Sequence, residues 1–143
     1  MNTGGYIEYF HNLFYVKVLG PWNFEKFERY NNDFNKLLIG NKYPSYSVLV
    51  ALEGDSLMTP EVSETFKKAT TKRNATGVKH VAFYLSKSAC LHAFKQQVRD
   101  LYQIKNINFK LFNDIDSAKS WLKTYEIILE DKLVNKLLYF TRE

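Results

Sequence analysis

The chain has 143 residues, 45% of them hydrophobic and 24% charged, and its 20 lysines and arginines against 15 aspartates and glutamates give a formal net charge of +5. This composition excludes a disordered chain and a disulfide scaffold, and the length fits a single domain over residues 1–143. The basic residues near 67–79 fall at the end of a predicted helix, where cations stabilise its carboxyl end, so no nucleic-acid partner is expected.

The sequence favours a cytoplasmic protein. Its one cysteine, Cys90, cannot form an intrachain disulfide and fits a reducing compartment. The segment Met1–Glu8 lacks the basic start and apolar run of a signal peptide. The longest strongly apolar run, Tyr46–Leu52, is far shorter than the roughly 20 residues that span a bilayer, so no membrane span is expected.

The first half of the chain alternates predicted strands and helices. Tyr6–Phe10 and Phe14–Val18 are short strands joined closely enough to form a hairpin, which gives the sheet one antiparallel edge. Asn23 can cap a helix that ends near Gly40. Ser47–Leu52 is a predicted strand that is apolar after its first residue, as a strand buried on both faces should be.

The alternation continues in the second half. Thr59, followed by a proline and an acidic residue, marks the start of a helix. Val78–Leu85 is the next strand, and either Ser86 or Ser88 can cap the helix after it. Phe109–Phe112 is a short final strand. Strands that alternate with helices in this way predict an α/β fold with a mixed, mostly parallel sheet and right-handed crossovers.

Asn113 or Asp114 can cap the last predicted helix, whose apolar stripe runs on towards the C-terminus. The stripe consists of Ile115, Ala118, Trp121, Leu122, Tyr125, Ile128, Leu129, Leu133 and Leu137. No glycine or proline interrupts it, so one long helix and two helices both fit, and Trp121 is expected to be buried. Residues 124–143 then form an extension that folds back on the sheet or pairs with a second copy. We favour a homodimer.

Chemical motifs are mostly absent. Neither G-x-G-x-x-G nor G-x-x-x-x-G-K-[ST] occurs, and no G-x-S-x-G turn exposes a serine nucleophile. The three histidines lack metal-ligand spacing, and Cys90 and His92 would point in different directions on a helix. The sequence therefore predicts no cofactor, no metal, no catalytic residue and no enzymatic activity.

Ligands of parallel sheets usually bind outside the carboxyl ends of the strands. Trp22, Asp55, Ser56 and Met58 fall there and form the candidate ligand or switch rim, although ordinary turns and caps explain each of them equally simply. A second feature is the cluster of aromatic residues around the predicted hairpin, which would line an apolar ligand cleft, form a partner-binding patch or, as we favour, fill the core. The cluster consists of Tyr6, Tyr9, Phe10, Tyr15, Trp22, Tyr43 and Tyr46.

The order of elements resembles that of the SpoIIAA-like (STAS/SEC14-type) family of small bacterial proteins. The likeness covers about Tyr6–Tyr125 and rests on the segments Val16–Pro21, Val48–Leu52 and Phe112–Leu122. It implies a right-handed βα superhelix related to anti-sigma factor antagonists and to the lipid-binding lobe of SEC14-type proteins.

The resemblance also implies a function. In the antagonists a serine after an aspartate is phosphorylated, and Ser56 is its nearest counterpart here, although the glycine that usually follows is missing. We therefore expect a regulatory or binding module of STAS type that acts through protein contacts. The alternative is a carrier or sensor of a small apolar, lipid-like ligand.

Overall fold

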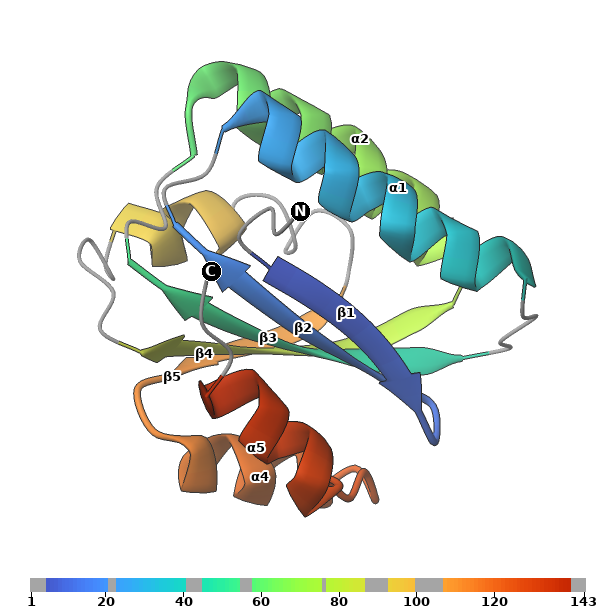
Figure 1. Ribbon diagram of the computed structural model, residues 1–143, viewed down its shortest axis with the longest axis vertical. Coiled ribbons are helices and arrows are strands. Elements are labelled where there is room, and N and C mark those ends of the chain that lie inside the picture. The colour runs from blue at the N-terminus through green and yellow to red at the C-terminus, as the bar shows by residue number, and fades with distance from the viewer. Residues whose placement is uncertain are drawn as a thin grey trace.

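The computed structural model describes residues 5–20, 23–40, 45–54, 58–75, 77–86, 93–99 and 107–139. They contain a five-stranded sheet of order β1-β2-β3-β4-β5, in which β1 is antiparallel to β2 and the other neighbours are parallel (Figure 1). The strands are β1 Gly5–Phe10, β2 Leu13–Leu19, β3 Tyr46–Glu53, β4 Val78–Ser86 and β5 Asn108–Phe112. The predicted mixed α/β fold with an antiparallel edge strand is confirmed.

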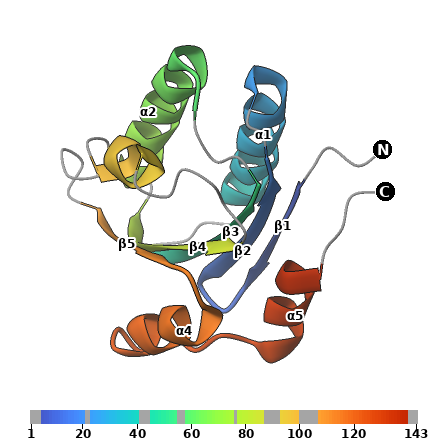
Figure 2. The same ribbon diagram turned by 90° about the vertical axis from the view of Figure 1, so that its left-hand side faces the viewer.

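Helices cover both faces of this sheet. Figures 1 and 2 show α1, α2 and a short helix over residues 93–99 on one face, and α4 and α5 on the other. The labelled helices are α1 Phe24–Gly40, α2 Pro60–Ala75, α4 Ile115–Lys123 and α5 Asp131–Tyr139. The described helices between the parallel strands thus lie on one side, and α4 and α5 supply the other layer.

Three of the predicted helix starts are confirmed by their capping bonds. Asn23 Oδ1 accepts a hydrogen bond of 2.8 Å from the backbone N–H of Lys26, and Thr59 Oγ1 accepts one of 3.2 Å from Val62. Before α4, Asp114 Oδ1 accepts one of 2.7 Å from the Ser117 N–H. Each cap satisfies a donor that the first helical turn leaves unpaired.

The core has two parts because β2 and β3 are buried on both faces. Alternate side chains of β2, such as Phe14 and Val16, join α1 and α2 in one cluster. The side chains between them, such as Leu13 and Tyr15, join α4 and α5 in the other. The apolar run of β3 was predicted to be buried on both faces, and the structure confirms this because β3 lies between two helical layers.

The C-terminal stripe differs from the expected extension. The chain forms two helices with a turn between them, in which Glu126 has a φ of 64°. Leu129, Leu133 and Leu137 are buried with β2 and β3, so the stripe folds back on its own sheet. We favoured a homodimer because a domain that ends near Trp121 was expected to have its sheet already covered. That reason is wrong, since α5 covers part of the sheet.

Two aromatic residues of the stripe are also less buried than predicted. Tyr125 is 41% exposed, because α4 ends at Lys123 and Tyr125 lies in the turn beyond it. Trp121 is half-buried and packs against Phe112 and Tyr125, with ring centroids 5.7 and 5.4 Å away. Helix α4 is thus shorter than the sequence pattern indicated.

Replacing Leu137 by alanine tests the position of α5. Leu137 is fully buried, so Leu137→Ala should lower the free energy of unfolding by about 2–5 kcal/mol in urea denaturation. Tyr139 lies on the same helix but is 76% exposed, and Tyr139→Ala should change it by less than about 0.5 kcal/mol. Equal, small effects of both substitutions would show that α5 does not pack on the sheet.

Candidate functional site

The candidate rim at the carboxyl ends of the strands is described only at Met58. Trp22, Asp55 and Ser56 lie outside the described residues. The Met58 side chain is buried in the cluster under α1 and α2. Its backbone N–H donates to Gln97 Oε1 (3.2 Å) and its carbonyl accepts from Gln97 Nε2 (3.1 Å). Met58 therefore stabilises the core beside the 93–99 helix rather than facing a ligand.

The aromatic residues near the hairpin mostly fill the core. Tyr15 and Tyr46 are buried, and the ring of Phe14 lies 4.8 Å from Tyr9 and 5.2 Å from Tyr46. Phe10 is 38% exposed and stacks on His11. Trp22 and Tyr43 of the predicted cluster lie outside the described residues, as does the side chain of Tyr6. The described aromatic rings thus favour the core interpretation over an apolar ligand cleft.

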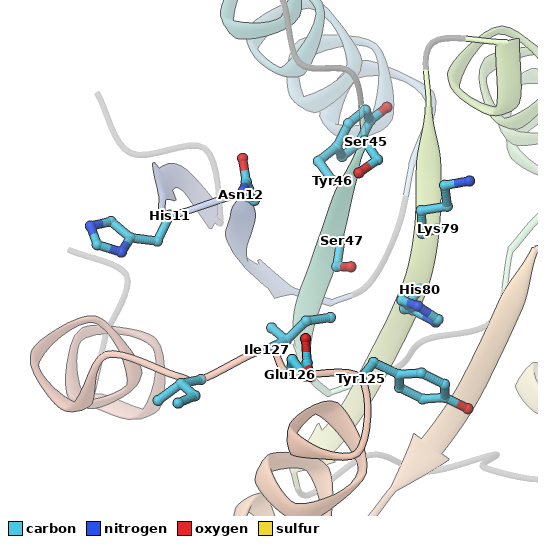
Figure 3. A pocket seen from close by; sticks show the side chains of 11 residues that line it. His11, Asn12, Ser45, Tyr46, Ser47, Lys79, His80, Tyr125, Glu126 and Ile127 are labelled. Atoms are coloured by element: carbon cyan, nitrogen blue, oxygen red, sulfur yellow. The ribbon is translucent and has the colours of Figure 1, made fainter.

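A cleft of about 510 Å³ opens at the opposite end of the strands, where β2, β3 and β4 begin (Figure 3). The β1–β2 turn bounds it on one side, and the chain that follows α4 bounds it on another. Its lining residues are His11, Asn12, Ser45, Tyr46, Ser47, Lys79, His80, Tyr125, Glu126, Ile127 and Ile128. Most of these side chains are polar, so we take this cleft as the candidate functional site.

The hairpin turn forms one wall of the cleft. His11 and Asn12 have φ values of 50° and 64°, as a two-residue turn with a left-handed backbone requires. The Tyr9 hydroxyl accepts from the Asn12 N–H and donates to Asn12 Oδ1, both at 2.9 Å. The Ser47 N–H donates to the Asn12 carbonyl (3.0 Å), which attaches the turn to the start of β3.

A β-bulge places an additional side chain in the cleft. Tyr46 is paired with Val78, but the next residue, Ser47, is paired with His80, so Lys79 is an extra residue in β4. His80 is in turn paired with Asn108 of β5. The bulge thus brings Lys79 beside a row formed by Ser47, His80 and Asn108 across three strands.

His80 is held by two residues. Its ring stacks on Tyr125 with centroids 4.0 Å apart and planes 24° from parallel. Asn108 Nδ2 lies 3.1 Å from His80 Nδ1 and donates to the Tyr125 hydroxyl (2.9 Å). The orientation of the Asn108 amide places its nitrogen at Nδ1, which assigns Nδ1 as the acceptor and the proton of the neutral ring to Nε2.

The environment keeps this ring neutral near pH 7. Burial, and in second place the like charge of the Lys79 ammonium, lower the pKa of His80 below its ordinary value. The candidate site therefore combines the imidazole of His80 and the hydroxyl of Ser47 with the ammonium group of Lys79 and the carboxylate of Glu126. Within the described ranges, no group of three or more His, Cys, Asp or Glu side chains could hold a metal ion.

Comparisons of the chain with protein-family models, with curated proteins and with solved structures found no match. The resemblance to the SpoIIAA-like family therefore stays a prediction. No helix in the described part of the chain has the length and apolar character needed to cross a membrane.

Replacing Lys79 tests the electrostatics of the cleft. Lys79→Gln removes a charge that opposes protonation of His80, so the pKa of His80 should rise, as followed by NMR of the imidazole during a pH titration. Lys36→Gln on α1, which covers the other face of the sheet, serves as the control and should leave it unchanged. An unchanged pKa in Lys79→Gln would contradict the position of Lys79 beside the ring.

Proposed function

We propose that this protein is a non-enzymatic binding module that acts through protein contacts at the edge of the sheet where the parallel strands begin. The observation that carries the proposal is a pair of exposed apolar side chains at and beside the polar cleft. Ile128 lines the cleft and is 76% exposed, and Phe10 is exposed beside His11 on the facing turn. Exposed apolar side chains that lie near one another mark surfaces where proteins make contact.

A binding role also agrees with the state of His80. The row of Ser47, His80 and Asn108 resembles a nucleophile, a base and an orienting residue, but no hydrogen bond joins Ser47 to His80. Because Nδ1 accepts from Asn108, Nε2 carries the proton and offers a donor rather than a base. The row is therefore suited to hydrogen-bond a ligand and not to activate the serine.

The resemblance to STAS-type proteins supports a regulatory role for such a module, in the cytoplasm, where the single cysteine would stay reduced. Phosphorylation of Ser56 remains part of this proposal. The alternative of an apolar ligand carrier has less support. It was based on the aromatic cluster around the hairpin, and most of the described rings of that cluster pack in the core. A homodimer is not part of the proposal, since the stripe that suggested it is buried.

Affinity capture from a lysate of the source cells tests the proposal with two matched variants. Ile128 and Tyr139 are both 76% exposed, but only Ile128 lines the cleft. The wild-type chain and Tyr139→Ser should recover the same protein, and Ile128→Ser should recover about tenfold less of it, since loss of an apolar side chain that contacts the partner costs about 1–2 kcal/mol.

Equal recovery with all three chains would contradict the proposed surface. If the wild-type chain recovers no specific protein, and native mass spectrometry shows a bound lipid-sized mass, the apolar carrier is the correct alternative.

A further inference from the structure

Two opposite charges line the cleft without pairing. Lys79 extends from the bulge in β4 and Glu126 from the turn after α4, and both are exposed. Elsewhere in the described residues, three lysines lie within 3.3–3.4 Å of a carboxylate oxygen. Lys79 and Glu126 form no ion pair with each other or with another described residue. Within the described part of the chain, the walls of the cleft thus carry an unpaired lysine and an unpaired glutamate.

Ser47 supplies a second, independent observation. The residue is 4% exposed, yet its hydroxyl has no hydrogen-bond partner among the residues that the structure describes. Figure 3 shows this hydroxyl directed from β3 towards β4, where His80 lies. A buried hydroxyl without a partner is unfavourable, so a ligand that hydrogen-bonds Ser47 recovers the lost hydrogen bond. The Nε2–H of His80 offers a second neutral donor beside it.

We propose that the cleft binds a small zwitterion, namely a free α-amino acid or a short peptide, with its carboxylate at Lys79 and its ammonium group at Glu126. Ser47 and His80 lie between the two charges and hydrogen-bond the polar atoms of the ligand. Ile127 and Ile128, on the wall formed after α4, contact an apolar side chain of the ligand. This inference goes beyond the proposed function and does not depend on a protein partner.

The pair of charges selects against ligands that carry only one. An anion that contacts Lys79 also brings its charge near Glu126, and an amine that contacts Glu126 brings its charge near Lys79. A zwitterion with its charges in the matching order meets an opposite charge at each end. A densely charged anion such as phosphate is disfavoured for the same reason. The volume of about 510 Å³ is within the range of small-molecule sites.

NMR titration of the full chain tests this inference. We expect leucine or leucyl-leucine to cause saturable shifts of the backbone amide signals of Ser47, His80 and Glu126. The comparison of these two probes shows which separation of the charges fits the cleft. N-acetylleucine lacks the ammonium group and leucinamide lacks the carboxylate, so each should bind about tenfold more weakly than the zwitterion that fits.

Charge-removing variants assign the two ends. Lys79→Gln should weaken binding of the zwitterion about tenfold and should not weaken that of leucinamide, from which it removes a like charge. Glu126→Gln should likewise weaken binding of the zwitterion about tenfold and should not weaken that of N-acetylleucine. Lys36→Gln on α1 is the matched control and should bind like the wild-type chain. Thermal unfolding of each variant, compared with that of the wild-type chain, verifies that it is folded.

The inference is overturned if neither zwitterion shifts these signals saturably, or if N-acetylleucine and leucinamide bind as well as the zwitterions. The protein-contact proposal is tested separately, because Ile128→Ser affects protein capture whether or not an amino acid binds.

Discussion

Burial of β2 and β3 on both faces is the constraint on which the rest of the structure depends. Alternate side chains of these strands point to opposite faces, so two helical layers are needed to exclude water from them. The described helices between the parallel strands, α1, α2 and the 93–99 helix, lie on one face and supply only one layer (Figure 2). The second layer comes from α4 and α5, which makes the C-terminal segment half of the core rather than an extension.

The same constraint creates the cleft. The chain must cross from α4, which lies against β4 and β5, to α5, which lies against β2. It does so over residues 124–130, past the edge where these strands begin, and there it faces the β1–β2 turn (Figure 3). The Glu130 N–H donates to the buried hydroxyl of Tyr15 (2.9 Å), which fixes this crossing to β2. Burial raises the pKa of Tyr15, so the hydroxyl stays protonated and neutral.

Sequence patterns predicted the strands, three helix caps and the fold class, because these depend on neighbouring residues. The cap predicted at Ser86 or Ser88 belongs to a helix whose start lies outside the described residues. The patterns left open whether the C-terminal segment is one helix or two, since the apolar stripe continues through the break between α4 and α5. They missed the site, because the bulge at Lys79 arises from pairing with β3 and leaves no local signal. Ser47 and His80 lay inside predicted strands, where a polar residue in an apolar run was the one available signal. The rule that ligands bind at the carboxyl ends of parallel strands predicted a site at the other end of the sheet, where Met58 is buried.

Hydrogen exchange of the backbone amides tests most directly whether the C-terminal helices belong to the domain and build the cleft. The account predicts that the amides of Leu133, Val134 and Leu137 exchange with an opening free energy close to that of β2 and β3, because both open only when the common core opens. Exchange of these amides as fast as in a free peptide, while β2 and β3 stay protected, would contradict it.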